Sequence, residues 1–363
     1  MVKIKTEALQ VATAKAVKGI GNLSILAITS AIGITVEDGV VTLSTTNNST
    51  NVDVRIVGAV DKNVSMYACT GGELFGKLVA KTTSEFITLE LKDNYLMFEG
   101  DGAYQLPLIV DEEGTMAKIT PIEVNGLTTY TVATKDLKKL LGYNKLAVSK
   151  SFDQPIFTGY CVKDNCIFTY NDNTACVSEV DLKNMSALLP GSMVELFALI
   201  EDKTTNVTIV ANKIKLDAAD MCITGATLEG LDLYPTEPLK NLVNAPEFNN
   251  TVKVPRNKLA SILDRLALFV DKVDKNKIHL DFSENALIIT NAHASAVEQI
   301  AYNEKSINNT NSYDVDLLDL KALIDVAATE VVTLVFGHDN GICLKDENTK
   351  YVVPIIDDDG EVA

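Results

Sequence analysis

Apolar and polar positions follow two periods along the chain, and the order in which these periods occur repeats three times. Helical spacing marks first helices at residues 6–18, 134–141 and 255–266, and second helices centred on residues 74–78, 196–200 and 320–324. Each helix is followed by alternating apolar residues on both sides of a tight turn, which predicts a strand hairpin. The repeat spans about 120 residues, too long for a solenoid unit, and points to three similar domains in a ring or an array.

Turn residues at matched positions mark the six predicted hairpins. They are Asp38-Gly39, Asp164-Asn165 and Glu284-Asn285 in the first hairpins, and Asp93-Asn94, Ala211-Asn212 and Asp339-Asn340-Gly341 in the second. Asn and Gly tolerate the positive φ that tight turns require. Any β-rich protein has such turns, but their repeated order with helices favours an α+β fold of three tandem domains.

Turn-rich segments separate the thirds. Residues 111–121 combine Gly, Pro and acidic residues, and residues 234–246 contain three prolines. Such composition is typical of exposed linkers. We therefore place the domains at residues 1–122, 123–245 and 246–363, each close to the commonest domain size.

Composition limits the class of protein. Of the 363 residues 47% are apolar, which predicts a globular chain. No apolar run approaches the ~18 residues that a membrane span needs, and we expect no signal peptide. The six cysteines share no spacing between the thirds, which favours buried thiols in a reducing, cytoplasmic compartment.

The first helices carry basic residues on the side opposite their apolar stripe, which is unexpected in a chain with a net charge of −17. Opposite each apolar stripe lie basic residues, namely Lys15 and Lys18, Lys135 and Lys139, and Lys258, Arg265 and Lys272, with Lys77 and Lys321 added by the second helices. These faces look nearly free of acidic residues. One such face is ordinarily a solvated helix surface, whereas three matched faces favour a shared phosphate-binding surface. Only three of the 32 basic residues are Arg, the usual reader of guanine, so nucleic-acid contacts should be independent of sequence.

Catalytic signatures are missing from the sequence. His279, His293 and His338 have no metal-ligand partner at helical or hairpin spacing, and the acidic residues 357–359 fit a solvated tail better than a cation site. No phosphate loop, Gly-x-Ser-x-Gly or His-Glu-x-x-His motif is present. We expect no enzymatic activity, cofactor or metal. A hydrolase would need a convergent titratable cluster, and the main alternative is a β-rich virion or adhesion protein of repeated domains.

Five segments carry a more specific pattern. They are Val40-Val-Thr-Leu-Ser-Thr-Thr, Pro155-Ile-Phe-Thr-Gly159, Gly191-Ser-Met-Val-Glu-Leu-Phe-Ala-Leu-Ile200, Leu228-Glu-Gly230 and Tyr351-Val-Val-Pro-Ile-Ile356. In order and spacing the chain resembles the bacterial DNA polymerase III beta subunit, the DNA sliding clamp, over nearly its whole length. The loop Tyr170-Asn-Asp-Asn-Thr-Ala-Cys176 lacks the family's His and Arg, and residues 357–363 run past the family's usual end. These departures suggest a virus-encoded or otherwise divergent member.

The resemblance implies a ring. Each domain would place two helices inside and antiparallel sheets outside, and two chains would close head to tail around double-stranded DNA to tether a polymerase. The basic residues named above would face the DNA. The subunit interface would join Tyr104 and Leu106 to Leu268 and Phe269, although helical periodicity also permits Phe269 to be core.

The resemblance also implies a cleft for a short apolar peptide of the polymerase or clamp loader. Its lining would be Phe157, Thr158, Gly159, Thr174, Cys176, Leu233, Pro235, Val352, Val353, Pro354, Ile355 and Ile356. Val352 and Val353 could instead be residues of a buried strand. Pro354 cannot donate to a sheet ladder, so we expect the segment after it to leave the sheet. The acidic tail should favour peptides with basic flanks.

Overall fold

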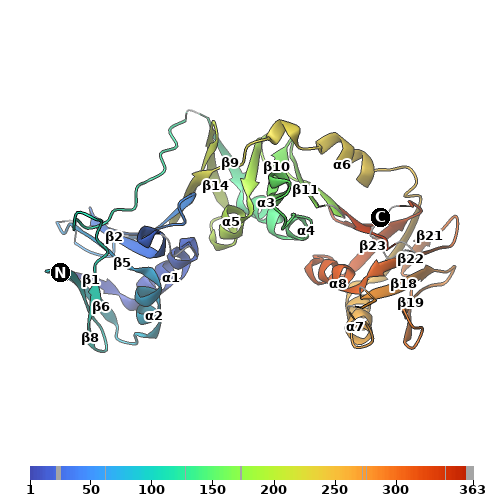
Figure 1. The fold of residues 1–363 in the computed structure, drawn as a ribbon, viewed down its shortest axis with the longest axis horizontal. Coiled ribbons are helices and arrows are strands. Elements are labelled where there is room, and N and C mark those ends of the chain that lie inside the picture. Colours follow the sequence, from blue (N-terminus) through green and yellow to red (C-terminus); the bar gives the residue numbers. More distant parts are fainter. Residues whose placement is uncertain are drawn as a thin grey trace. The chain divides into compact units, whose positions relative to one another are not determined.

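The computed structural model describes residues 1–21, 26–61, 63–126, 128–171, 174–271, 273–274, 276–339 and 341–356. The chain forms two compact units, Met1–Thr134 with Glu195–Thr227, and Lys135–Val194 with Leu228–Ala363 (Figure 1). The middle third contributes to both units, so the division into three domains stays a prediction. None of the helices in the described part of the chain is both long and apolar enough to span a membrane.

The first unit contains an eight-stranded and a four-stranded antiparallel sheet, in the orders β5-β2-β3-β4-β16-β15-β14-β9 and β1-β6-β7-β8. Its elements are β1 (Val2–Lys5), α1 (Thr6–Ala16), η1 (Val17–Gly19), η2 (Ala27–Ser30), β2 (Ala31–Glu37), β3 (Val40–Thr46), β4 (Thr50–Val57), β5 (Met66–Gly71), α2 (Gly72–Lys81), β6 (Phe86–Lys92), β7 (Tyr95–Glu99), β8 (Ala103–Pro107), β9 (Thr129–Ala133), η5 (Glu195–Leu199), β14 (Thr204–Val210), β15 (Lys213–Asp217) and β16 (Met221–Ala226). The helices α1 and α2 pack against each other.

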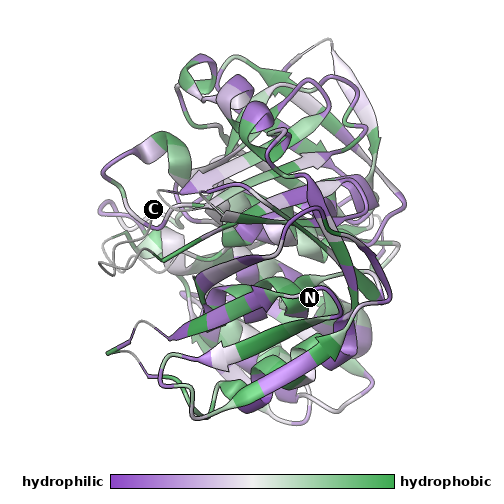
Figure 2. Ribbon diagram, turned by 90° about the vertical axis from the view of Figure 1, so that its right-hand side faces the viewer, coloured by the Kyte–Doolittle hydropathy of each residue, from purple (hydrophilic) through white to green (hydrophobic). Residues whose placement is uncertain are grey.

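The second unit contains a nine-stranded and a four-stranded sheet, in the orders β13-β10-β11-β12-β25-β24-β23-β17-β21 and β20-β19-β18-β22. Its elements are α3 (Thr134–Leu137), η3 (Lys138–Leu141), α4 (Tyr143–Leu146), η4 (Pro155–Thr158), β10 (Gly159–Lys163), β11 (Cys166–Asn171), β12 (Thr174–Glu179), β13 (Ala187–Pro190), α5 (Gly191–Val194), η6 (Leu231–Leu233), α6 (Thr236–Val243), β17 (Asn250–Pro255), α7 (Arg256–Leu266), β18 (Lys277–Phe282), β19 (Ala286–Asn291), β20 (Val297–Ala301), β21 (Glu304–Ser306), β22 (Asn311–Asp316), α8 (Leu317–Val326), β23 (Val331–Phe336), β24 (Gly341–Asp346) and β25 (Thr349–Pro354). Hydrophobic and hydrophilic residues alternate along many of these strands (Figure 2).

Equivalent backbone hydrogen bonds relate the three repeats. The first residue of each leading helix donates its N–H to the carbonyl directly before a strand of the second hairpin, in the pairs Thr6 to Glu85, Thr134 to Lys203 and Arg256 to Glu330. Three residues further on, Leu9, Leu137 and Leu259 are all fully buried. Positions in the three repeats can therefore be matched by counting from these helix starts.

The hairpin predictions are confirmed, and the helix predictions are confirmed in the outer repeats. Gly39 and Asn165 adopt the positive φ expected of Gly and Asn, and Asp38, Asp93 and Asp164 adopt it as well. The middle repeat differs, because its leading helix is one α-turn followed by the 3-10 helix η3, and its second is the short α5 followed by η5. A helix of one turn is not stable alone, so buried side chains such as Leu140 and Phe197 must hold these segments in place.

Neighbouring repeats are joined by main-chain pairing of strands. In the first unit β4 pairs antiparallel with β16, and in the second β12 pairs antiparallel with β25. Each pair unites the third strand of one repeat's first sheet with the last strand of the next repeat. Two strands in these positions have no such partner within the described part of the chain. They are β20 in the third repeat and β8, the last strand of the first repeat, and each lies at the edge of a four-stranded sheet.

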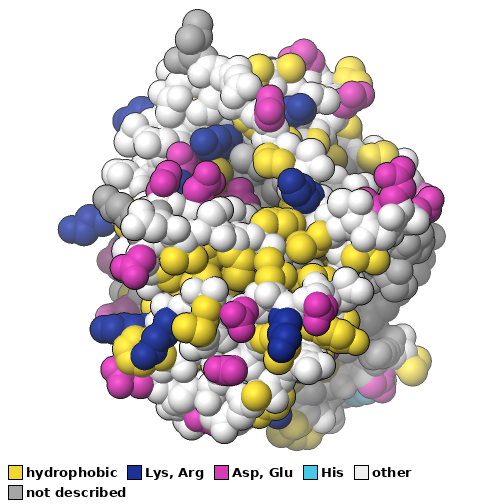
Figure 3. Space-filling view, turned by 90° about the vertical axis from the view of Figure 1, so that its left-hand side faces the viewer, with side chains coloured by type: hydrophobic (Ala, Val, Ile, Leu, Met, Phe, Trp, Pro, Cys, Tyr) yellow, Lys and Arg dark blue, Asp and Glu magenta, His cyan; other side chains and the backbone are white. Residues whose placement is uncertain are grey.

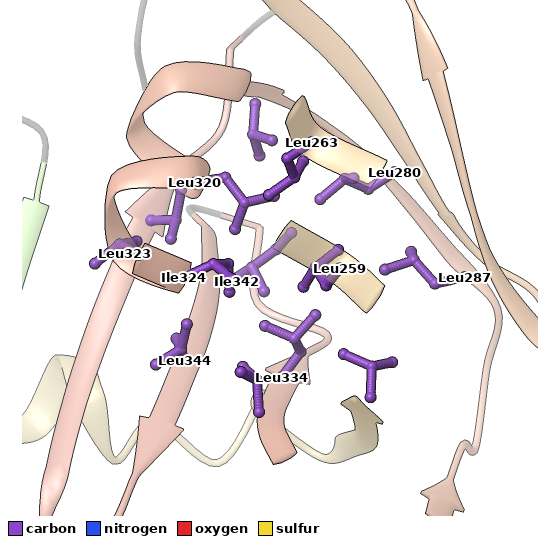
Figure 4. Packing of buried hydrophobic residues seen from close by; sticks show 14 of the residues in the cluster. Leu259, Leu263, Leu280, Leu287, Leu320, Leu323, Ile324, Leu334, Ile342 and Leu344 are labelled. Carbon is purple, nitrogen blue, oxygen red and sulfur yellow. The ribbon is translucent and has the colours of Figure 1, made fainter. Parts of the chain in front are cut away.

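The core of the second unit shows how the helices are held. Leu259 and Leu263 of α7 and Leu320 and Ile324 of α8 pack over Leu334 of β23 (Figure 4). The Asp316 side chain caps α8 by accepting hydrogen bonds from the backbone N–H groups of the first turn. This packing fixes one face of each helix against the sheet and leaves the opposite face available.

The cysteines behave as small buried hydrophobes, as predicted. All six are free and buried. Burial raises the pKa of Cys69 to about 11 and that of Cys161 to about 12, so neither thiol is ionised near neutral pH.

Candidate functional sites

Lys15 does not lie on an open basic face, contrary to the sequence prediction. It is 6% exposed, and its Nζ lies 2.8 Å from Asp220 Oδ2 and 3.0 Å from Glu201 Oε2. Burial alone would lower the pKa of Lys15, but the hydrogen bonds to Asp220 and Glu201 outweigh it and raise that pKa. Its charge is used inside the protein, so we remove Lys15 from the candidate phosphate contacts.

A second cation strengthens the same joint between the first two repeats. Arg55 Nη2 on β4 lies 2.9 Å from Asp217 Oδ1 on β15, and the Arg55 backbone N–H donates to the Asp220 carbonyl at 2.7 Å. We call these residues, Lys15, Arg55, Glu201, Asp217 and Asp220, the ionic seam. It ties α1 and β4 to strands contributed by the middle repeat.

Three of the predicted basic residues present an available charge. Lys18, Lys135 and Lys258 are exposed, and within the described part of the chain none has an acidic partner within 4.0 Å. Lys138, which the sequence pattern did not single out, joins Lys135 and Lys139 around a hollow of about 230 Å³ beside Val326. Lys272 lies outside the described residues.

The other predicted cations are already paired. Lys77 pairs with Glu73, Lys139 with Asp136 at 3.8 Å, Arg265 with Glu298 at 2.6 Å, and Lys321 with Asp264 at 2.7 Å and Asp325 at 3.0 Å. The expectation that these faces are nearly free of acidic residues is therefore wrong. Residues four apart on a helix are neighbours, and this spacing gives Lys77 and Lys321 their carboxylates.

The predicted peptide cleft divides into buried and accessible residues. Cys176 is fully buried, and Val352 and Val353 are 3% and 2% exposed because β25 is an inner strand of the nine-stranded sheet. Val352 points into the cluster under α6, whereas Val353 points into the cluster under α7 and α8. The buried-strand alternative therefore describes these two valines. β25 ends at Pro354, and the Ile356 backbone N–H donates to the Asp314 carbonyl at 2.8 Å.

The remaining cleft residues differ in exposure, and Pro354 and Ile356 are buried like the two valines. Leu233 is 76% exposed, while Phe157 is 8% exposed and packs edge-on against Tyr170 and Tyr234 at ring-centroid distances of 4.9 and 5.5 Å. The others are held locally. Thr158 Oγ1 donates to the Pro155 carbonyl, Thr174 donates to Asn171 Oδ1, Gly159 is buried, and Pro235 and Ile355 are half-buried.

Sequence reasoning missed the residues that extend this surface. Gly230 has a φ of +90°, and a Cβ there would lie 2.9 Å from Ile156 Cγ2 and 3.9 Å from Leu233 Cδ1. Ile156 and Leu231 are partly buried against the same cluster as Phe157. We call Ile156, Leu231 and Leu233 the Leu233 patch. The signals for it in the sequence were the glycine turn that brings these side chains together and the segment Pro155–Gly159, which contains Ile156.

The proposed subunit contact residues are mostly exposed. Leu268 is 81% exposed and Phe269 52%, directly after α7, and Tyr104 on the edge strand β8 is 44% exposed. Leu106 is 3% exposed and belongs to the interior of its own repeat, so it cannot supply much contact area. Hydrophobic side chains gather in a band across one face of the first unit (Figure 3).

No constellation of the described residues points to a metal centre. No group of three or more His, Cys, Asp or Glu side chains among them is arranged to hold a metal ion. His279 Nδ1 instead lies 2.8 Å from Asp314 Oδ1, and His293 Nε2 lies 2.7 Å from Asp274 Oδ2. Each is a surface pair at the side of a strand or turn.

Comparison with known proteins identifies the fold. No protein-family model matches the chain, and no curated protein matches its sequence. The solved structure of the DNA polymerase III beta subunit from Thermotoga maritima matches with 16% identity and a TM-score of 0.82, over 98% of this chain and 99% of that one. The DNA polymerase sliding clamp from Bacillus subtilis matches with 14% identity and a TM-score of 0.84, over 98% of both chains. The beta subunit from Streptococcus pyogenes matches with 16% identity and a TM-score of 0.85, over 98% and 99%. The chain thus has the α+β fold of the bacterial sliding clamps, as its resemblance to them predicted.

Proposed function

We propose that this chain is a DNA sliding clamp, two copies of which close into a ring around double-stranded DNA and tether a polymerase. The observation that carries the proposal is the clamp fold over 98% of the chain. A ring of this kind performs no chemistry, and it would act in the cytoplasm, where bacterial DNA is replicated. We retain the three domains 1–122, 123–245 and 246–363 as its repeating units.

The strand joints support closure by a second copy. Within the chain, the third strand of a repeat's first sheet pairs with the last strand of the next repeat at β4–β16 and β12–β25. β20 is the third strand of the first sheet in the third repeat, so by the same rule it should pair with the last strand of a following repeat. β8 is the last strand of the first repeat, and it lies at a sheet edge. Pairing β20 of each copy with β8 of the other covers both edges and gives a closed two-fold assembly.

The apolar residues beside these edges support the same joint. Counted from the helix starts, Phe269 matches Gly19 and Ala147, and both of those positions are buried within the chain. Phe269 and Leu268 are exposed apolar side chains that a second copy would cover. A monomer gains nothing from exposing them.

The DNA contacts in this proposal are few and diffuse. Lys18, Lys135 and Lys258, with Lys272 as an untested addition, would meet phosphate without reading sequence. Strong binding of these lysines to phosphate would hinder sliding along the DNA. A closed ring does not need such binding, because it encircles the DNA and cannot leave sideways. The net charge of −17 disfavours DNA binding elsewhere on the surface.

The Leu233 patch is our candidate for the polymerase and loader site. Exposed Leu233, with Ile156 and Leu231 over a packed aromatic base, suits a short peptide whose few apolar anchors carry most of the binding energy. Truncating the chain before residue 352 would delete buried strand residues. The better test is Leu233→Asp, which should abolish binding of the cognate polymerase's C-terminal peptide without changing the thermal midpoint.

Retention on circular DNA tests the clamp proposal. We expect light scattering at micromolar concentration to give twice the chain mass of 39.3 kDa. The loaded protein should stay on nicked circular DNA and leave the same DNA after linearisation. Leu268→Asp with Phe269→Asp should yield monomers, whereas Val57→Asp, which charges a valine that is 74% exposed on β4, should not.

Three outcomes would contradict the proposal. A wild-type monomer would remove the ring. A dimer that is retained equally on circular and linear DNA would bind DNA without encircling it. A dimer that binds neither DNA would favour the alternative function, a structural protein of repeated β-rich domains.

A further inference from the structure

One position in the leading helix ties each repeat to its neighbour. Counted from the helix starts, the tenth residues are Lys15, Tyr143 and Arg265. Lys15 reaches Asp220, directly before β16, at 2.8 Å, and the Tyr143 hydroxyl donates to Asp346, the last residue of β24, at 2.7 Å. Both acceptors flank the turn that leads into the strand joining the two repeats. Different chemistry thus serves the same role at the two internal joints.

Arg265 holds the third such position and has capacity for another acceptor. Its Nε and Nη2 donate to the two Glu298 carboxylate oxygens at 2.6 and 3.0 Å, and its Nη1 donates to Ser261 Oγ at 2.8 Å. The side chain is 52% exposed. A guanidinium carries five N–H donors in a fixed plane, so it can bind a second carboxylate. Lys15 already holds two carboxylates in this way.

The turn before β8 supplies an acid in the corresponding turn. Gly100-Asp101-Gly102 connects β7 to β8 and has the same length as the turn Ala218-Ala219-Asp220 that connects β15 to β16, although Asp101 is the middle residue of its turn and Asp220 the last. Asp101 is exposed and accepts hydrogen bonds from the Thr83 backbone N–H at 2.6 Å and Thr83 Oγ1 at 3.0 Å. These bonds lower its pKa, so the carboxylate is ionised at neutral pH. In the described part of the chain Asp101 has no basic partner within 4.0 Å.

We propose that Asp101 of a second copy binds Arg265 where β8 meets β20, so that an ion pair locks each of the two closure joints. This inference rests on the proposed ring and names a residue pair that determines its stability. Arg265 would hold Glu298 of its own repeat and Asp101 of the neighbouring chain together, as Lys15 holds Glu201 and Asp220. Arg265 is thereby a subunit contact and not a phosphate contact.

A charge swap tests the pair. Because every copy supplies both groups, a chain that carries Arg265→Asp and Asp101→Arg together restores the attraction in the opposite sense. We expect each single variant to raise the dimer dissociation constant, measured by sedimentation, about tenfold, and the double variant to return within about threefold of wild type. Asp101→Asn keeps an acceptor for Thr83 and should weaken the dimer like the other single variants, which separates loss of charge from loosening of the turn.

Lys258→Asp is the matched control. It reverses an exposed charge on the same helix, and combining it with Asp101→Arg should give no recovery. A wild-type monomer would overturn the proposed ring itself. A wild-type dimer whose single variants dimerise normally, or whose double variant shows no recovery, would overturn the Arg265–Asp101 pair while leaving the ring intact.

Discussion

Replacing Lys15 by methionine should destabilise the first unit without weakening DNA contacts. The side chain is buried between two acidic partners at 2.8 and 3.0 Å, so the variant leaves the ionic seam without its central cation. Removing one partner of a fully buried pair costs about 3–5 kcal/mol, and an exposed pair contributes about 0.2–1 kcal/mol. Lys15 is buried, but the Glu201 and Asp220 side chains are 75% and 40% exposed, which places the loss at about 2 kcal/mol.

Thermal unfolding measures this loss directly. For a unit of this size, about 2 kcal/mol corresponds to a midpoint lowered by about 4–8 °C. A double-mutant cycle of Lys15→Met with Asp220→Asn should show coupling, because the two residues share one interaction. Lys18→Met, one turn further along and exposed, should leave the midpoint unchanged and slow loading on DNA.

The opposite pattern would refute the reasoning. If Lys15→Met unfolds like wild type but loads more slowly on DNA, then Lys15 acts on phosphate, as the sequence pattern suggested. The ionic seam would in that case not hold Lys15 in solution.

Three further predictions concern the remaining charges and one buried hydroxyl. Reversing Lys18, Lys135 and Lys258 together to Glu should impair loading on DNA of any sequence and flatten the dependence of affinity on salt, with unchanged circular dichroism. Burial raises the pKa of Asp53, so just above pH 3.8 the folded state binds more protons than the unfolded state, and stability falls as pH rises through the folded pKa. Asp53→Asn should remove this fall in urea titrations that start at pH 3.8 and move upward. Tyr143→Phe should lower the unfolding free energy by about 1–2 kcal/mol by deleting the 2.7 Å hydrogen bond to buried Asp346, whereas Tyr130→Phe should not.

Features decided by local chemistry were predictable from the sequence. The turns at Asp38, Asp93 and Asp164 follow from residues that tolerate positive φ. The buried stripe of α7, with Leu259 and Leu263, follows from helical spacing. The middle repeat's helices were harder, because a pattern of eight residues fits a 3-10 helix nearly as well as an α-helix.

Features decided by distant residues were not predictable. Lys15 is paired with residues 186 and 205 positions away, and no local pattern distinguishes such a lysine from an exposed one. The prediction that Val352 and Val353 line the cleft was wrong for a related reason. The resemblance located the segment that contains Val352 and Val353, but successive residues of a strand face opposite sides, and only the sheet order shows that both sides are covered.

The paired cations change what the proposed clamp must rely on. If most basic residues of the helix faces are neutralised by Glu73, Asp264, Glu298 and Asp325, few phosphates can be neutralised per chain. Each neutralised phosphate releases counterions and thereby adds to the affinity for DNA. A surface that contacts few phosphates therefore binds DNA weakly at any salt concentration. An open chain would therefore leave DNA readily. Retention must come from closure, which makes the edges of β8 and β20, with Leu268, Phe269 and Arg265 beside them, the part of the molecule on which the proposed function depends.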